Sequence, residues 1–272
     1  MGRMRNVVGR LWGNPYTQAK LQKLAFEVRW EHGISVRSLA NALDAFEKRT
    51  ISSEEGMWIG KIESLRAELL SASETARTCR LGAVPPLWSL LLFRLVREFK
   101  PLKCLELGTS LGFSAAYQAA ALEVNRAGSM VTIEGNKSVA AMARSNLQRI
   151  GVSRCVVKTG NFGDVLQAAL EDLAPLDFAF LDGDHQEYAT LSYFEQIVPF
   201  LSESALIVFD DISWSSGMAR AWKVITEDER VKISVDLSRL GVSAVTNQLK
   251  RKQVLDCGLT WWERGLAGIA SL

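Results

Sequence analysis

The chain has 272 residues, of which 48% are hydrophobic and 23% charged, and its formal net charge is +2. This composition is typical of a globular protein, and the length allows one large domain or a domain with an appendage. The weak charge gives no sign of a nucleic-acid or anionic membrane partner, so we predict neither.

Targeting and membrane signals are weak. The apolar run within the basic first ten residues is too short for a signal peptide, and the most apolar segment, 87–96, is too short to cross a bilayer. The four cysteines lie far apart and form no Cys-x-x-Cys pair, which argues against zinc and disulfides. We therefore expect a cytoplasmic protein with reduced thiols.

The first 80 residues are predicted to form an N-terminal helical extension. Apolar residues between about 17 and 76 recur at helical spacing, as at Leu39, Leu43 and Phe46, which predicts three helices. Ser52 and Glu55 have the spacing of a capping box at a helix start. The extension could act as a lid, contact the substrate or form a homodimer interface. A further helix is expected from Pro85-Pro86 to about Lys100.

From residue 102 the pattern changes to short apolar strands that alternate with helices, which is typical of a parallel sheet covered on both faces. Strands are predicted at 103–107, 129–133, 154–159, 177–181 and 205–209, and two more at 232–237 and 242–245. The intervening helices are expected near 114–123, 137–150, 162–173, 188–200 and 217–227. We assign 81–247 to this α/β domain and 248–272 to a helical C-terminal tail.

The most informative stretch is the glycine-spaced turn after the first strand. Gly108 can adopt backbone angles closed to other residues, and Gly112 lets the start of the next helix approach a ligand. Glu106 places a carboxylate just before the turn, which suits a cationic ligand better than a pyrophosphate. The Gly-x-Gly-x-x-Gly dinucleotide fingerprint is absent, so a dehydrogenase is disfavoured. Taken alone, the turn fits a nucleotide-type cofactor loop no better than it fits a plain strand-turn-helix or a loop for another Rossmann ligand.

The pattern Glu-x-Gly-x-x-x-Gly-x-Ser resembles the first motif of class I S-adenosylmethionine-dependent methyltransferases, specifically the small-molecule O-methyltransferases related to catechol O-methyltransferase. The resemblance covers roughly 80–246. It implies a Rossmann-like seven-stranded sheet whose last strand is antiparallel, and S-adenosyl-L-methionine as cofactor. The residues that it assigns to the cofactor around this turn are Glu106, Gly108, Thr109, Ser110, Gly112 and Ser114.

Further cofactor contacts are expected after the second and third strands, because ligands of open parallel sheets bind beyond the carboxyl ends of the strands. Glu134, followed by Gly135, could accept hydrogen bonds from a ribose diol, and the family uses an acidic residue there for that purpose. Asn161 and Phe162 match the adenine-contacting segment more loosely. The alternatives are an exposed acid at Glu134 and a helix N-cap at Asn161.

Carboxylates also follow the fourth and fifth strands. Asp182, Asp210 and Asp211 would repel one another if left bare, and a divalent cation such as Mg²⁺ is the simplest way to neutralise them. The three residues match the metal site of catechol O-methyltransferase, although that enzyme has asparagine where Asp211 stands. The run Asp-Asp-Ile-x-Trp-Ser-x-Gly-Met resembles a bacterial branch of small-molecule methyltransferases.

Methyl transfer needs a group that deprotonates the acceptor hydroxyl. His185 stands where the catechol enzyme carries its catalytic lysine, so we predict it as the base that also contacts the cofactor, with Asp184 as the alternative and Asp182 assisting. Trp214 could wall an aromatic substrate or be half-buried packing.

The sequence as a whole predicts an S-adenosylmethionine-dependent methyltransferase acting on a hydroxyl of a small molecule, which could be aromatic or a natural-product intermediate, with Mg²⁺ assisting. Two alternatives remain: a metal-independent O- or N-methyltransferase in which the paired aspartates only orient substrate, and a non-catalytic S-adenosylmethionine-binding partner protein.

Overall fold

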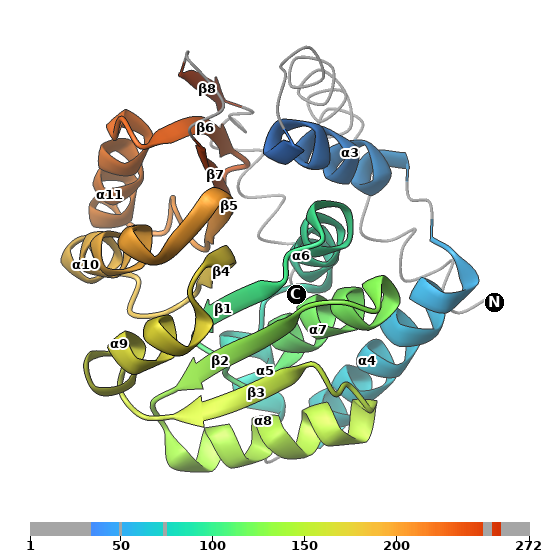
Figure 1. Ribbon diagram of the computed structural model, residues 1–272. Coiled ribbons are helices and arrows are strands. Elements are labelled where there is room, and N and C mark those ends of the chain that lie inside the picture. The colour runs from blue at the N-terminus through green and yellow to red at the C-terminus, as the bar shows by residue number, and fades with distance from the viewer. Residues whose placement is uncertain (1–33, 49–50, 73–74, 247–251, 257–272) are drawn as a thin grey trace.

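The computed structural model describes residues 34–48, 51–72, 75–246 and 252–256, and its described strands form one sheet in the order β3-β2-β1-β4-β5-β7-β6-β8 (Figure 1). The strands are β1 (Lys103–Leu107), β2 (Ser129–Glu134), β3 (Cys155–Thr159), β4 (Leu176–Leu181), β5 (Leu201–Phe209), β6 (Val231–Asp236), β7 (Gly241–Thr246) and β8 (Gln253–Asp256). Strands β1 to β5 are parallel, and β7 is antiparallel to both β5 and β6. The predicted seven-stranded sheet is confirmed, and β8 adds an edge strand.

Each face of the sheet carries its own hydrophobic cluster because successive strand residues point to opposite faces. Cys104 and Phe178 belong to the cluster that includes α3 (Ile34–Lys48), α4 (Ser53–Ser71), α5 (Ala76–Gly82), α6 (Pro86–Phe99), α7 (Phe113–Asn125) and α8 (Lys137–Ile150). Leu105 and Ala179 belong to the opposite cluster, with α9 (Phe162–Leu173), α10 (Glu187–Ile197) and α11 (Ser216–Glu227). The helices expected on both faces are therefore present.

The helices of the extension pack onto the same core as the sheet. Leu39 and Leu43 of α3 are fully buried in the first cluster, and α3 packs against α6. The predicted capping box is confirmed: Glu55 N–H donates to Ser52 Oγ, and Ser52 N–H donates to the Glu55 carboxylate. The part of the predicted helical extension before residue 34 lies outside the described residues.

The C-terminal tail differs from the prediction. Residues Gln253–Asp256 form β8, parallel to β6, where a helix was expected. The open edge of β6 offers unpaired backbone groups, and pairing with an added strand satisfies them. The remainder of the predicted helical tail, 257–272, lies outside the described residues.

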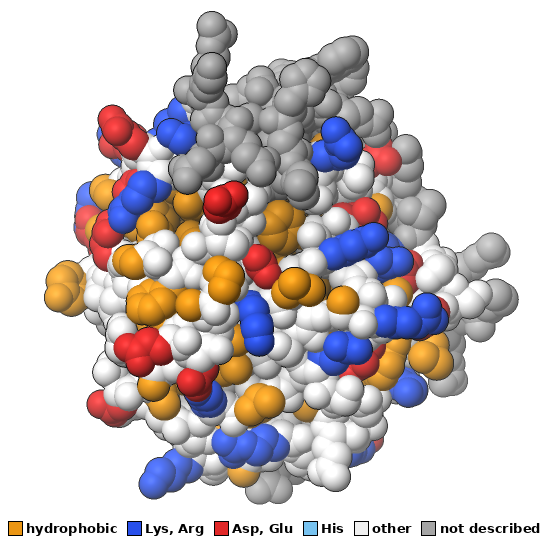
Figure 2. Space-filling model, in the orientation of Figure 1, with side chains coloured by type: hydrophobic (Ala, Val, Ile, Leu, Met, Phe, Trp, Pro, Cys, Tyr) orange, Lys and Arg blue, Asp and Glu red, His pale blue; other side chains and the backbone are white. Residues whose placement is uncertain are grey.

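Charged side chains of both signs are interspersed over the described surface in Figure 2. In the described part of the chain no single helix is long and apolar enough to cross a bilayer, although α5 and α6, bent by 59° at their junction, would pass together by length and composition.

Candidate active site

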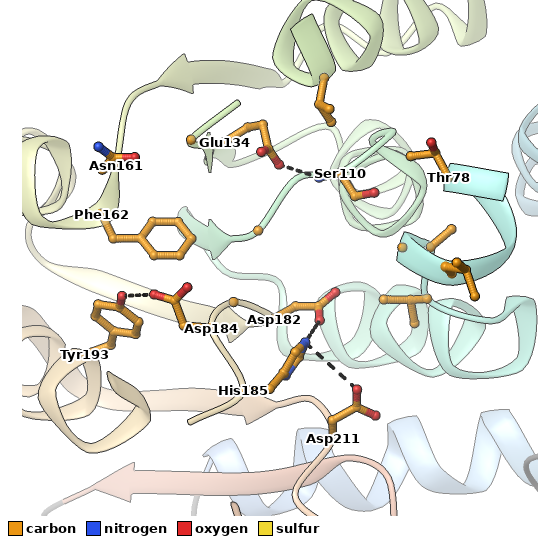
Figure 3. A pocket seen from close by; sticks show the side chains of 18 of the residues that line it. Thr78, Ser110, Glu134, Asn161, Phe162, Asp182, Asp184, His185, Tyr193 and Asp211 are labelled. Atoms are coloured by element: carbon orange, nitrogen blue, oxygen red, sulfur yellow. Dashed lines mark hydrogen bonds and ion pairs between the residues drawn. The ribbon is translucent and has the colours of Figure 1, made fainter. Parts of the chain in front are cut away.

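A cavity of about 690 Å³ opens beyond the carboxyl ends of the parallel strands, where the predicted site residues gather (Figure 3). Such a volume suits a small-molecule ligand. The predicted residues that line it are Gly108, Ser110, Glu134, Gly135, Asn161, Phe162, Asp182, Asp184, His185 and Asp211. They lie at or just beyond the carboxyl ends of β1, β2, β3, β4 and β5, as expected for an open parallel sheet.

The turn after β1 is pressed against the end of β4. Gly108 has φ of 94°, and a Cβ atom built there would lie 2.0 Å from the carbonyl oxygen of Asp182. The Asp182 N–H donates to the Leu107 carbonyl at 2.8 Å and so extends the strand ladder by one residue. Only glycine fits this approach, and the close contact fixes Asp182 beside the turn.

Several residues predicted around this turn lie beneath the cavity and do not line it. Glu106 is fully buried, and its carboxylate accepts hydrogen bonds from Ser114 Oγ and Gln118 Nε2. Thr109 is buried with its hydroxyl 2.6 Å from that of Thr132. These side chains support the turn from below.

Gly112 has a structural role that the sequence analysis did not predict. A Cβ atom built there would meet the side chains of Leu147 and Ala143 on α8 at 3.4 and 3.5 Å. Its φ of 84° forms the N-cap of α7. The glycine therefore allows α7 and α8 to approach each other at the base of the turn.

Glu134 is held at the rim of the cavity by two backbone donors. Its Oε2 accepts from Ser110 N–H at 2.9 Å (Figure 3), and its Oε1 accepts from Asn136 N–H at 3.0 Å. Each oxygen retains a lone pair for a ligand, so the carboxylate could accept two hydrogen bonds from a diol. Its placement agrees with a binding role and disfavours that of a solvated surface acid.

Aromatic rings form the side of the cavity beyond Glu134. The rings of Phe162 and Tyr193 meet edge to face at 5.2 Å between centroids, and the Tyr193 hydroxyl donates to Asp184. A Cβ atom on Gly183 would lie 2.5 Å from the Phe162 ring, so the loop after β4 packs directly on this wall. Phe162 therefore contributes an apolar aromatic ring to the lining of the cavity.

His185 lies between two carboxylates. Its Nε2 is 3.5 Å from Asp182 Oδ1 and 3.9 Å from Asp211 Oδ2 (Figure 3). Burial raises the pKa of Asp182 well above its ordinary value, and the nearby Asp210 carboxylate raises it further. The pKa of Asp211 is also raised, by burial and by Asp210. The pocket thus makes ionisation of two of the three predicted metal ligands less favourable than it is in water.

Asp210 is paired with an arginine that the sequence analysis did not select. Arg239 Nε donates to Asp210 Oδ1 at 2.8 Å, and Arg239 Nη2 donates to Asp210 Oδ2 at 2.6 Å. Asp210 is only 1% exposed and does not line the cavity, whereas Arg239 does. Burial disfavours the charged guanidinium, but Asp210 and Asp211 more than offset this and raise the pKa of Arg239.

The three aspartates, as arranged, do not fit the predicted Mg²⁺. Magnesium binds carboxylates whose negative charge is available to it, but Asp210 is buried away from the cavity and its charge is already compensated by the paired Arg239 guanidinium. Within the described residues no group of three or more His, Cys, Asp or Glu side chains is placed to hold a metal ion. The guanidinium supplies the neutralising charge that the sequence analysis assigned to a cation.

Arg239, Tyr193, Thr78 and Leu81 also line the cavity and were missed as site residues. A signal for Arg239 existed. Strand β6 runs parallel to β5, because both are antiparallel to β7, so the turn after β6 reaches the same edge as Asp210.

Comparisons with known proteins agree with this architecture. A family model described as "Methyltransferase domain" matches residues 105–212. A catechol O-methyltransferase of Niastella koreensis is 36% identical over 110 residues, which are 40% of this chain and 48% of that protein. One from Mycobacterium tuberculosis is 31% identical over 153 residues, 56% of this chain and 66% of that protein. The chain thus spans about half to two thirds of these relatives.

Solved structures extend the likeness to the fold. An O-methyltransferase from Bacillus cereus, in complex with SAH, has a TM-score of 0.56 at 24% identity and covers 76% of this chain and 98% of its own. The O-methyltransferase TomG from Streptomyces achromogenes, in complex with SAM, has a TM-score of 0.57 at 23% identity and covers 76% of this chain and 97% of its own. The family match assigns residues 105–212 to a methyltransferase domain, and the solved structures show the same fold over about three quarters of the chain.

Proposed function

We propose that this protein transfers a methyl group from S-adenosylmethionine to a hydroxyl of a small molecule. The carrying observation is the cavity itself, which joins the Gly108 turn and Glu134 on one side to His185 and Asp211 on the other. A single cavity of this kind can hold a nucleoside cofactor and direct its reactive carbon toward the second group of residues. The relatives named as catechol O-methyltransferases support hydroxyl methylation.

In this proposal the cofactor lies across the Gly108 turn, with its ribose hydroxyls on Glu134 and its adenine against Phe162 and Asn161. The carboxylate is already oriented by Ser110 and Asn136, so little ordering is needed on binding. Asp182 and the backbone of the turn border the methionine end. Glu106 then acts through the turn that it supports and not by direct contact.

The chemical step requires alignment of the acceptor oxygen with the methyl group and removal of its proton. His185 is the group we assign to that proton, because its Nε2 faces the cavity between Asp182 and Asp211. We favour the metal-independent form of the reaction, because the Arg239 guanidinium is paired with both carboxylate oxygens of Asp210 and already balances its charge.

Calorimetric titration with S-adenosylhomocysteine tests the cofactor site. Glu134→Gln should weaken binding by roughly tenfold or more, because a hydrogen bond to a charged group contributes about 1.5–3 kcal/mol. Glu203→Gln is the control, since Glu203 is exposed near the start of β5, at the opposite edge of the sheet. Equal affinity in both variants would remove the ribose role of Glu134.

Methyl transfer itself is tested with radiolabelled S-adenosylmethionine and a panel of hydroxylated small molecules. Transfer by the native protein, and a loss of about 100-fold in His185→Gln, would support the assignment. Tight cofactor binding without transfer to any acceptor would favour the non-catalytic alternative.

A further inference from the structure

The turn between β6 and β7 is built to hold Arg239 at the acceptor side of the cavity. The Leu237 N–H donates to the Leu240 carbonyl at 2.9 Å, which closes the hairpin, and Ser238 adopts a left-handed φ of 73°. The Ile212 N–H donates to the Arg239 carbonyl at 3.0 Å. Arg239 is thus tied to the end of β5 through its backbone as well as its side chain.

The side chain of Arg239 is paired on one edge and open on another. Its Nε and Nη2 form the two-point pair with Asp210, and Nη2 also lies 3.5 Å from Asp211 Oδ1. Its Nη1 has no hydrogen-bond partner within the described residues, and the side chain is 30% exposed where it lines the cavity. Two N–H groups of a fixed guanidinium are therefore available to a ligand.

We propose that Arg239 is the resident cation of the acceptor site: it takes the place of a divalent metal and donates from Nη1 to the acceptor oxygen. The inference rests on the proposed methyltransferase function. A buried carboxylate such as Asp210 requires a partner, and the two-point arginine pair meets that need without a bound ion. A metal at the same carboxylates would also lie against a positive charge.

This arrangement selects the chemical class of the acceptor. A hydrogen bond from a guanidinium already paired with Asp210 acidifies a hydroxyl much less than direct coordination to a divalent ion does. A histidine base takes the proton of a phenol or enol, whose pKa is near 10, far more readily than that of an aliphatic alcohol. We therefore infer a phenolic or enolic acceptor. The O–H bond breaks toward His185, and the oxygen forms its bond to the methyl carbon as the C–S bond breaks.

Binding of Mn²⁺, followed by electron paramagnetic resonance in the presence of S-adenosylhomocysteine, tests the metal replacement directly. The native protein should bind no Mn²⁺ at the site. Arg239→Ala should gain a bound ion, because it frees both Asp210 oxygens next to Asp211. Arg239→Lys should still exclude the ion, because it keeps the positive charge. Stoichiometric Mn²⁺ binding by the native protein would overturn the proposal.

Turnover gives the second readout. With a phenol from the acceptor panel, the native rate should be unchanged by EDTA, and Arg239→Ala should lower kcat/KM by about 100-fold. Arg230→Ala is the matched control, because Arg230 makes a similar two-point pair with Glu195 before β6, at the other edge of the sheet. Turnover abolished by EDTA, or faster on aliphatic alcohols than on phenols, would contradict the inference.

Calorimetry with S-adenosylhomocysteine separates this inference from the proposed function. Arg239→Ala should bind that nucleoside within about twofold of the native protein, since Arg239 faces the acceptor side. If the native protein failed to bind the nucleoside, the methyltransferase proposal would fall, whatever the behaviour of Arg239.

Discussion

Glu106 is a carboxyl group enclosed beneath the glycine turn, and its environment makes the stability of the protein depend on pH. Burial raises its pKa from 4.5 to about 8, although hydrogen bonds from Ser114 and Gln118 act in the opposite direction. Between these values the folded state keeps a proton that the unfolded state releases. Stability from this group is therefore complete below about 4.5 and is lost as the pH rises toward 8.

Glu106→Gln should remove this dependence. The amide cannot ionise, and its NH₂ can donate to the Gln118 Oε1, which is buried without a hydrogen-bond partner. We expect the variant to melt roughly 5 °C or more above the native protein at about pH 9, with a smaller difference at about pH 5. Thermal unfolding by circular dichroism across this range measures both curves. If the melting temperatures of the two proteins changed with pH in parallel, ionisation of Glu106 would not affect stability, which would contradict this prediction.

At the residue scale, the sequence predicted the site where residues follow parallel strands, and failed where a side chain's direction mattered. Glu134 and Asp182 line the cavity, as expected, because strand ends converge on one edge of the sheet. Glu106 was expected to face the ligand, but strand alternation turns it toward α7. Arg239 was missed because the β6–β7 hairpin lies beyond the last motif of the sequence analysis, the run that begins at Asp210-Asp211. Its partner Asp210 is also distant from it in sequence.

At the scale of elements, α4 is joined to α6 by a buried ion pair. Glu55 accepts from Arg94 Nη1 at 3.0 Å, and the two side chains are 8% and 4% exposed. Burial alone would raise the pKa of Glu55, but the hydrogen bond from Ser52 and the charge of Arg94 lower it below its ordinary value. The Glu55 carboxylate thus takes part in capping the start of α4 and also holds this helix against α6.

Glu55→Gln should destabilise the protein by about 3 kcal/mol, because it removes the charge that compensates a buried arginine. Urea unfolding followed by fluorescence measures this change. The neighbouring Glu54→Gln is the control, since Glu54 is exposed in the same helical turn. Equal midpoints for the two variants would mean that the pair contributes little to docking.

The boundaries of most elements were predictable because local signals mark them. Helix α8 spans Lys137–Ile150, which is the predicted range, and it is capped by Asn136 at its N-terminus and by Gly151 at its C-terminus. Strand β5 begins at Leu201, four residues before the predicted start at 205, because Leu201 pairs with Leu176 of β4. Pairing between distant strands leaves no local trace in the sequence. The same applies to β8, whose place is set by the exposed edge of β6.

At the scale of the whole molecule, the pattern of alternating strands and helices was enough to predict a sheet with helices on both faces. The pattern did not predict how closely the N-terminal helices join that sheet. Leu39 and Leu43 of α3 share a cluster with Phe178 of β4, so these helices are part of the core. Their amphipathic spacing indicated that an apolar face is buried, but not against which surface.

The β6–β7 hairpin lies after residue 212, outside the segment matched by the methyltransferase family model. The loops that we propose bind the cofactor and the arginine that we propose faces the acceptor are thus encoded by separate stretches of chain. Exchange of this short hairpin between related proteins would alter the charge next to the reacting oxygen while leaving the nucleoside pocket in place. Such modularity offers a route by which one scaffold acquires new acceptors through a change of only a few residues.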